Sequence, residues 1–356
     1  EILGDGVAVG TILLVEEDVN SCYFLSLLKY FLAEGLATGH AISVITGEET
    51  PEEFLKNLPR NLSLEAAELQ KLEEEALTKQ QQQKEAEKKG QSNLTIAWQY
   101  EKYLDNPNSN TAKSINQSGT LKTASVQAFC HSFDLSKPLR PETLEGKPIT
   151  TIDVQQLSQD NVFQEVYTQI ADSIDKEFRS NAPETTSPRN ILRIGIRSIA
   201  SPMWTDVSKP ENVRQFFMFL HALKGLLRSS LGICMITLPS HLFSQVVVKD
   251  VQHLSDTAMA FESFDGTHLK NMSVFADYSG QFFIRKLPKL NSLVSHMPET
   301  LNYVFKLKRR KLRIEMLHLG PEESRTTAKE KPEPKKKLPN MLCMPGPPSK
   351  SNPLDF

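Results

Sequence analysis

Three carboxylates stand where a nucleotide-binding chain would hold phosphate. A glycine-rich turn at residues 4–10 leads into the apolar run Thr11 to Val15, which predicts a buried strand, and the next three residues are Glu16, Glu17 and Asp18. A working phosphate loop needs glycines whose backbone N–H groups converge on the phosphates, a Lys for the terminal charge and a hydroxyl for magnesium. No Lys follows until Lys29, inside the next predicted helix. The sequence therefore predicts an ATPase scaffold with a degenerate phosphate loop.

A second acidic pair, Glu48-Glu49, follows the next apolar run, Ala41 to Ile45. In ATPases of this layout, carboxylates at this place orient the attacking water, so both residues are candidate general bases. A different interpretation is that the pair precedes a helix beginning at Pro51, where the helix dipole favours acidic side chains. A base without held phosphates has nothing to act on.

The strand predicted over Ile191 to Ile199 is placed where such ATPases carry the Asp that holds magnesium. This chain has Arg197-Ser198 there instead, so the metal carboxylate is also missing. Arg197 is a candidate arginine finger that reaches a phosphate across a subunit boundary. The alternative is an ion pair at the surface.

Two groups of basic residues are candidates for contacts with nucleic acid. The loops predicted at 200–214 and 239–250 carry Lys209, Arg214 and Lys249. Residues 306–313 alternate cationic and apolar side chains, which predicts one strand with a cationic face that includes Lys308, Arg309 and Arg310. That face would contact RNA phosphates or protect an edge strand from aggregation, and the pattern favours neither.

The periodicity along the chain predicts an α/β fold. Continuous apolar strands alternate with amphipathic helices, which is typical of a mostly parallel sheet flanked by helices. Helices are expected over residues 20–37, 161–178 and 211–229. The last three expected strands, over residues 254–264, 280–287 and 304–319, alternate as antiparallel strands at one edge do. A Glu/Gln/Lys-rich stretch and a polar loop interrupt this pattern. We expect a core in two parts, 1–58 and 130–319, separated by an insertion at 59–129 and followed by a flexible Pro/Lys-rich tail at 320–356.

Composition excludes several classes of function. The net charge of −2 over 356 residues requires any nucleic-acid contact to come from a local basic patch. The four cysteines and eight histidines have no metal-ligand spacing, so no metal or cofactor is expected. No apolar run reaches the roughly 18 residues of a membrane span.

The chain resembles the PAXNEB family, the fourth subunits of the Elongator complex. The resemblance rests on the glycine turn with its acidic run and on these further blocks: residues 27–35, 96–100, 189–196, 201–204, 305–312 and 354–356. It implies a RecA-like P-loop fold with degenerate motifs, and a natural N-terminus before Glu1. It also implies a non-catalytic role beside the fifth and sixth subunits in a heterohexameric ring. By resemblance that ring binds tRNA and supports wobble-uridine modification, in the cytoplasm and nucleus, with the other Elongator subunits.

Two other functions stay open from the residues. An ATPase with an unorthodox site is favoured by Glu48-Glu49 and opposed by the three carboxylates after the first strand. A recombinase-like DNA-binding module is favoured by the predicted fold and opposed by the modest charge.

Overall fold

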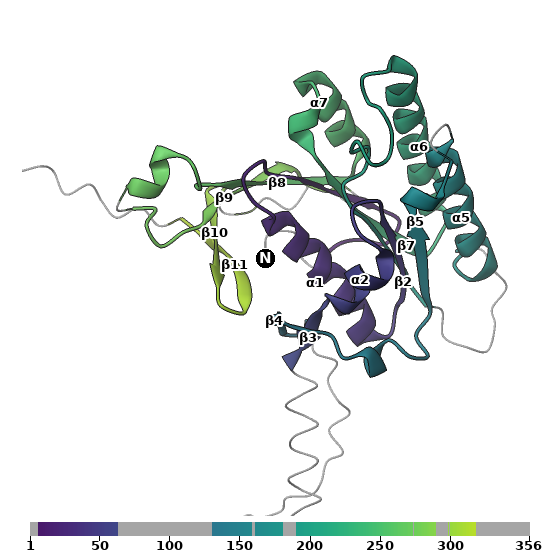
Figure 1. Ribbon diagram of the computed structural model, residues 1–356, viewed down its shortest axis with the longest axis horizontal. Helices are drawn as coiled ribbons and strands as arrows, with labels where there is room; N and C mark the ends of the chain where they lie inside the picture. Colours follow the sequence, from purple (N-terminus) through teal and green to yellow (C-terminus); the bar gives the residue numbers. More distant parts are fainter. Residues whose placement is uncertain are drawn as a thin grey trace, which may run out of the picture. The chain divides into compact units, whose positions relative to one another are not determined.

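A mixed β-sheet lies at the centre of the chain, with helices on both of its faces (Figure 1). The computed structural model describes residues 6–62, 130–158, 161–180, 190–272, 274–289, 298 and 300–317. Contacts divide the chain into Glu1–Leu317 and His318–Phe356, and every described residue belongs to the first unit. The predicted tail at 320–356 and residues 63–129 of the predicted insertion therefore lie outside the described residues.

The described strands of the main sheet follow the order β11-β10-β9-β8-β1-β7-β6-β2-β5. Their bounds are β1 Ile12–Glu16, β2 Ala41–Thr46, β5 Ile149–Asp153, β6 Leu192–Ile196, β7 Gly232–Leu238, β8 Thr257–Ser263, β9 Gly280–Lys286, β10 Tyr303–Lys308 and β11 Lys311–Met316. The pairs from β8 to β5 are parallel, and the pairs from β8 to β11 are antiparallel. The predicted α/β fold of the RecA-like type, with antiparallel strands at one edge, is confirmed.

Two hydrophobic clusters hold the helices to the sheet. Alternate residues of β1 point to opposite faces, so Leu13 and Val15 pack under α1 (Tyr23–Thr38) and α2 (Pro51–Lys56). Ile12 and Leu14 face the other cluster, which includes residues of α5 (Val162–Glu177), α6 (Pro210–Arg228) and α7 (Gln245–Leu254). None of the helices that the structure describes is long and apolar enough to cross a bilayer.

A small separate sheet forms beside α1. Strand β3 (Pro59–Asn61) pairs antiparallel with β4 (Phe133–Pro138), although β3 lies within the range predicted as an insertion. The chain thus enters and leaves residues 63–129 through neighbouring strands.

The structure differs from the sequence predictions at five elements. Strand β5 was not predicted, and β6 is shorter than the predicted strand Ile191 to Ile199. The segment 239–250 is not all loop, because α7 begins at Gln245 and runs to Leu254. The strand predicted from Leu254 begins at Thr257 and is parallel to β1 on one side.

The fifth difference concerns the basic run at 306–313. The prediction of one strand from Val304 to Leu319 was wrong, since the chain reverses at Arg309 and Arg310 and forms the hairpin β10–β11. That turn contains no Gly, Asn, Asp or Pro, the residues that signal a two-residue hairpin loop in a sequence.

Candidate functional site

The predicted phosphate loop lies at the carboxyl ends of the parallel strands. Strand β1 runs between β7 and β8, so the residues after it meet the residues that follow those two neighbours. Open α/β sheets bind ligands at this edge, where neighbouring connections leave in opposite directions. Glu16 is the last residue of β1, and Glu17 and Asp18 follow it directly.

Glu17 is buried among hydroxyl donors, with 8% of its surface exposed. Its Oε1 accepts hydrogen bonds from Ser198 Oγ at 2.9 Å and from Thr237 Oγ1 at 2.6 Å. The same Thr237 oxygen accepts a bond from the backbone N–H of Ser198 at 2.7 Å. Burial raises the pKa of Glu17 above its ordinary value, although these hydroxyl donors oppose the shift. One carboxylate thus joins the ends of β1, β6 and β7.

Glu16 and Asp18 are also held by donors from the protein. Gln252 of α7 donates to Glu16 Oε1, and burial raises the pKa of Glu16. Asp18 Oδ2 accepts from Ser21 Oγ at 2.7 Å and from the backbone N–H of Ser263, the last residue of β8, at 3.1 Å. The donors at this edge already have carboxylate acceptors. An incoming phosphate would meet negative charge and would have to displace these bonds.

The predicted general bases differ in their surroundings. Glu49 forms an ion pair with Arg197, whose guanidinium carbon also lies 6.0 Å from the centre of the Phe54 ring. Glu48 is exposed, and its charge contributes to raising the pKa of Glu17. The ion pair of the alternative interpretation of Arg197 is present, but the pair is partly buried and does not lie at the surface. The use of Arg197 as an arginine finger stays a prediction, and it would require the pair with Glu49 to break.

The turn after β6 has an unusual backbone. Ser198 and Ala200 have φ angles of 46° and 55°, in the left-handed region that residues other than glycine rarely occupy. The turn ends at Trp204, which is fully buried and stacks on Phe163 of α5 with ring centres 5.8 Å apart. Trp204 packing and the Glu17 bonds to Ser198 thus fix the two ends of this turn.

Ser198 and Thr237 were not identified from the sequence as partners of Glu17. The available signal was Thr237, a hydroxyl residue near the end of the apolar run Leu231 to Leu238. A fully buried hydroxyl needs a hydrogen-bond partner, and the strand order places that partner directly after β1.

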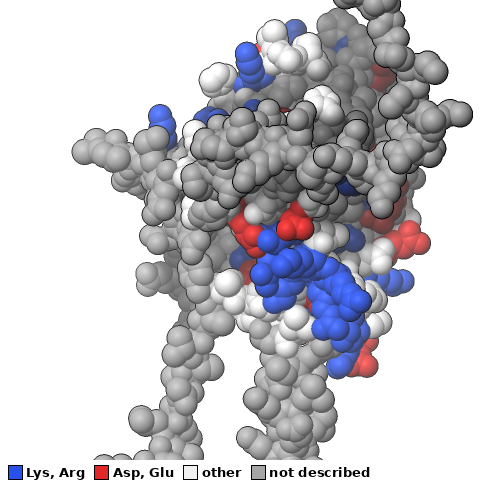
Figure 2. Space-filling model, turned by 90° about the vertical axis from the view of Figure 1, so that its left-hand side faces the viewer, with Lys and Arg blue, Asp and Glu red and all other residues white. Residues whose placement is uncertain are grey.

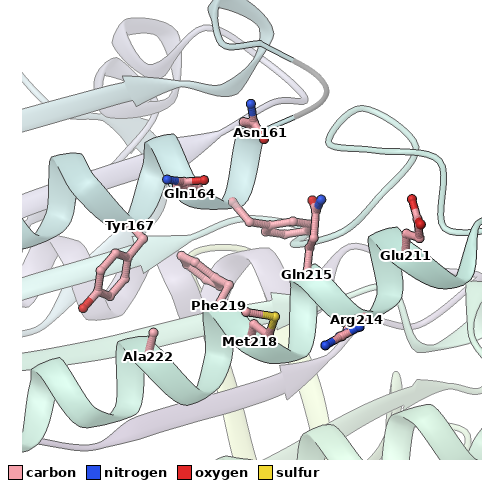
Figure 3. Close-up of a pocket in the computed structure, with 10 residues that line it drawn as sticks. Asn161, Gln164, Tyr167, Glu211, Arg214, Gln215, Met218, Phe219 and Ala222 are labelled. Carbon is pink, nitrogen blue, oxygen red and sulfur yellow. The ribbon is translucent and has the colours of Figure 1, made fainter.

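The basic residues predicted in the loops at 200–214 and 239–250 occupy two kinds of position. Lys209 is the N-cap residue of α6 and remains in a loop. Arg214 and Lys249 do not, because they lie on α6 and α7. Arg214 lines an open groove of about 700 Å³ between α5 and α6, whose lining also includes Glu211, Tyr167 and Met218 (Figure 3).

Lys308, Arg309 and Arg310 lie at the end of the β10–β11 hairpin and are exposed. Figure 2 faces the side of the molecule on which this hairpin lies and shows a continuous band of Lys and Arg side chains. This is the basic patch that a chain with a net charge of −2 would need for nucleic acid.

Within the described part of the chain, no three His, Cys, Asp or Glu residues gather closely enough to hold a metal ion. Cys22 and Cys130 are exposed and Cys234 is buried, each as a free thiol.

The fold and its edge define a RecA-like α/β protein whose first strand ends in bonded carboxylates. The PAXNEB protein family matches residues 1–342, and the chain belongs to that family. It is 34% identical to Elongator complex protein 4 of Dictyostelium discoideum, over 91% of this chain and 73% of that protein. Identity is also 34% to the Danio rerio protein of the same name (92% and 81% covered) and 32% to the Homo sapiens protein (92% and 76% covered).

Proposed function

We propose that this chain is a non-catalytic subunit of the Elongator complex. In this proposal it joins the fifth and sixth subunits in a heterohexameric ring of RecA-like folds, in the cytoplasm and nucleus. The ring binds tRNA and supports modification of the wobble uridine, while another subunit carries out the chemistry. The names of the relatives support membership in the complex.

The observation that carries the non-catalytic role is the burial of Glu17 between the hydroxyls of Ser198 and Thr237. Catalysis of phosphoryl transfer depends on cationic groups and backbone donors that hold the phosphates in place. Here the donors at the carboxyl edge hold carboxylates that belong to the chain. The degenerate phosphate loop therefore serves the fold and leaves no cradle for a triphosphate.

Exposed apolar side chains at the same edge support assembly. Val19 follows β1 and is 66% exposed, Met203 follows β6 and is 45% exposed, and Val246 is the second residue of α7, after β7, and is 69% exposed. The carboxyl ends of parallel strands share one edge, so these side chains lie on segments that leave the sheet at the same edge as residues 16–18. Apolar side chains that are exposed at an edge are available for contact with another protein. We propose that a neighbouring ring subunit covers them.

Co-expression with the fifth and sixth subunits tests the assembly. We expect the three chains to elute together, and we expect Val246→Asp to abolish this because it places a charge in an apolar contact. Met218→Asp is the matched control, since Met218 is 62% exposed and lies on the α5–α6 groove. Assembly that tolerates Val246→Asp, or a chain that remains monomeric beside both partners, would contradict the proposed contact.

The purified chain alone should neither bind ATP tightly nor hydrolyse it. The physical reason is the repulsion between a triphosphate and the carboxylates of residues 16–18. Isothermal titration with Mg-ATP and a phosphate-release assay measure the two quantities. Tight binding that disappears in Glu48→Ala would instead support the unorthodox ATPase.

A further inference from the structure

The end of the β10–β11 hairpin concentrates positive charge. Six of the eight residues from 306 to 313 are Lys or Arg, and none is acidic. We call residues 306–313 the basic hairpin; on the side of the molecule where it lies, Lys and Arg form one band (Figure 2). Lys308, Arg309, Arg310 and Arg313 are exposed.

The strand register places like charges directly opposite each other. Lys306 faces Arg313 and Lys308 faces Lys311 across the hairpin. Like charges at directly opposite positions destabilise an antiparallel pair. Glu315 forms an ion pair with Lys306, but no ion pair is found for Lys308 or Arg309 among the described residues. The hairpin keeps a repulsion that a bound anion would relieve.

The basic hairpin extends beyond the sheet that supports it. Strand β10 pairs with β9 only from Tyr303 to Phe305, so its cationic half has β11 as its partner. The turn is Arg309-Arg310. Arg309 has a positive φ of 20°, an angle at which glycine is more usual. The chain thus forms a two-stranded ribbon whose end is cationic and projects from the sheet.

Three contacts fix this ribbon to the body of the chain. The backbone N–H of Leu135 in β4 donates to the Arg310 carbonyl at 2.8 Å. The N–H of Leu312 donates to the hydroxyl of Tyr30 in α1 at 3.1 Å. Arg310 Nε lies 3.6 Å from Asp134 Oδ2, a buried carboxylate. Because the ribbon is held, binding through its end costs little ordering of the backbone.

Protection of an edge strand accounts for only part of this charge. Strand β11 is the edge of the sheet, so Lys311 and Arg313 are placed to deter edge-to-edge pairing. Lys308 belongs to β10, which has β11 on its outer side, and Arg309 lies in the turn. Neither residue blocks the edge.

We propose that the basic hairpin, through Lys308 and Arg309, binds the phosphate backbone of RNA. The inference rests on the proposed function, because it names the surface through which this chain contacts the RNA of the assembly. Phosphates are strong acceptors for Lys and Arg and carry the charge that the ribbon lacks. Contacts of this kind position the RNA without reading its sequence.

The test compares two variants of the assembled three-subunit complex that lose the same charge. Lys308→Gln with Arg309→Gln removes two cations from the ribbon, and Lys209→Gln with Lys249→Gln removes one from the N-cap of α6 and one from α7. Affinity for tRNA is measured by filter binding across a series of salt concentrations. We expect the hairpin variant to reduce the magnitude of the slope of log affinity against log salt by about 1.4 to 1.8 and to weaken binding about twentyfold near 0.15 M salt. Lys308→Arg with Arg309→Lys should bind as the unchanged complex does.

The outcomes separate the inference from the proposed function. Unchanged slope and affinity in the hairpin variant would overturn the inference while tRNA binding by the complex stands. A hairpin variant that fails to assemble would overturn it too, because the ribbon would then be a protein contact. If the unchanged complex shows no salt-dependent tRNA binding, the proposed function itself fails.

Discussion

Glu17→Gln should make the chain more stable at pH 8 and leave its stability nearly unchanged at pH 4. The raised pKa of Glu17 means that the folded state binds this proton more tightly than the unfolded state. The stabilisation that the protonated Glu17 provides is therefore complete when the pH is below 4.5, the ordinary pKa of a Glu side chain. It is lost as the pH rises through the raised pKa of Glu17 in the folded chain. A neutral Gln keeps an acceptor for both hydroxyls and removes the buried charge.

The free energy of unfolding at pH 8 is expected to rise, because Gln removes a carboxylate charge whose burial is unfavourable. Glu48 and Arg197 also act on Glu17, the first raising its pKa and the second lowering it, so both are kept unchanged. Urea unfolding of the purified chain at the two pH values measures the difference. Glu17→Ala is the contrasting variant, because it leaves the hydroxyls of Ser198 and Thr237 without their acceptor and should cost about 1–3 kcal/mol. A Gln variant less stable than the unchanged chain at pH 8 would show that the charge itself holds the three strands together.

Trp204→Ala should lower the free energy of unfolding by about 3–5 kcal/mol, the cost of removing a large aromatic side chain from a core. Trp204 is fully buried and stacks on Phe163, which also packs against Phe216 and Phe219 of α6. The cavity would lie directly behind the turn at 198–204. Guanidinium unfolding measures the loss.

Trp204→Phe is the matched control. Within the described residues the indole Nε1 of Trp204 has no hydrogen-bond partner, so Phe gives up volume and no bond. We expect a loss of less than half that of the Ala variant. Equal losses of unfolding free energy for the Phe and Ala variants would contradict this, and would mean that a hydrogen bond of the indole nitrogen contributes to stability.

The sequence determined the layered fold because its signals are local. Apolar runs of strand length, each followed by a helical period, depend only on neighbouring residues and on which face is buried. The helices α1, α5 and α6 and the strands β1, β2 and β7 match their predicted ranges within a few residues. The three carboxylates after β1 were likewise visible, because they replace residues at known spacing from a strand.

Only the tertiary structure decided which side chains meet. Glu17 is 181 residues from Ser198 and 220 from Thr237, and no local pattern specifies a bond over such separations. The strand order places β1 between β7 and β8, which brings Thr237 of β7 to Glu17 and Ser263 of β8 to Asp18. The basic hairpin was also decided by the tertiary structure, since Arg309 and Arg310 are not residues that predict a turn. The run folds back on itself through the pairing of β10 with β11 and through the contacts with β4 and α1, none of which the local sequence specifies.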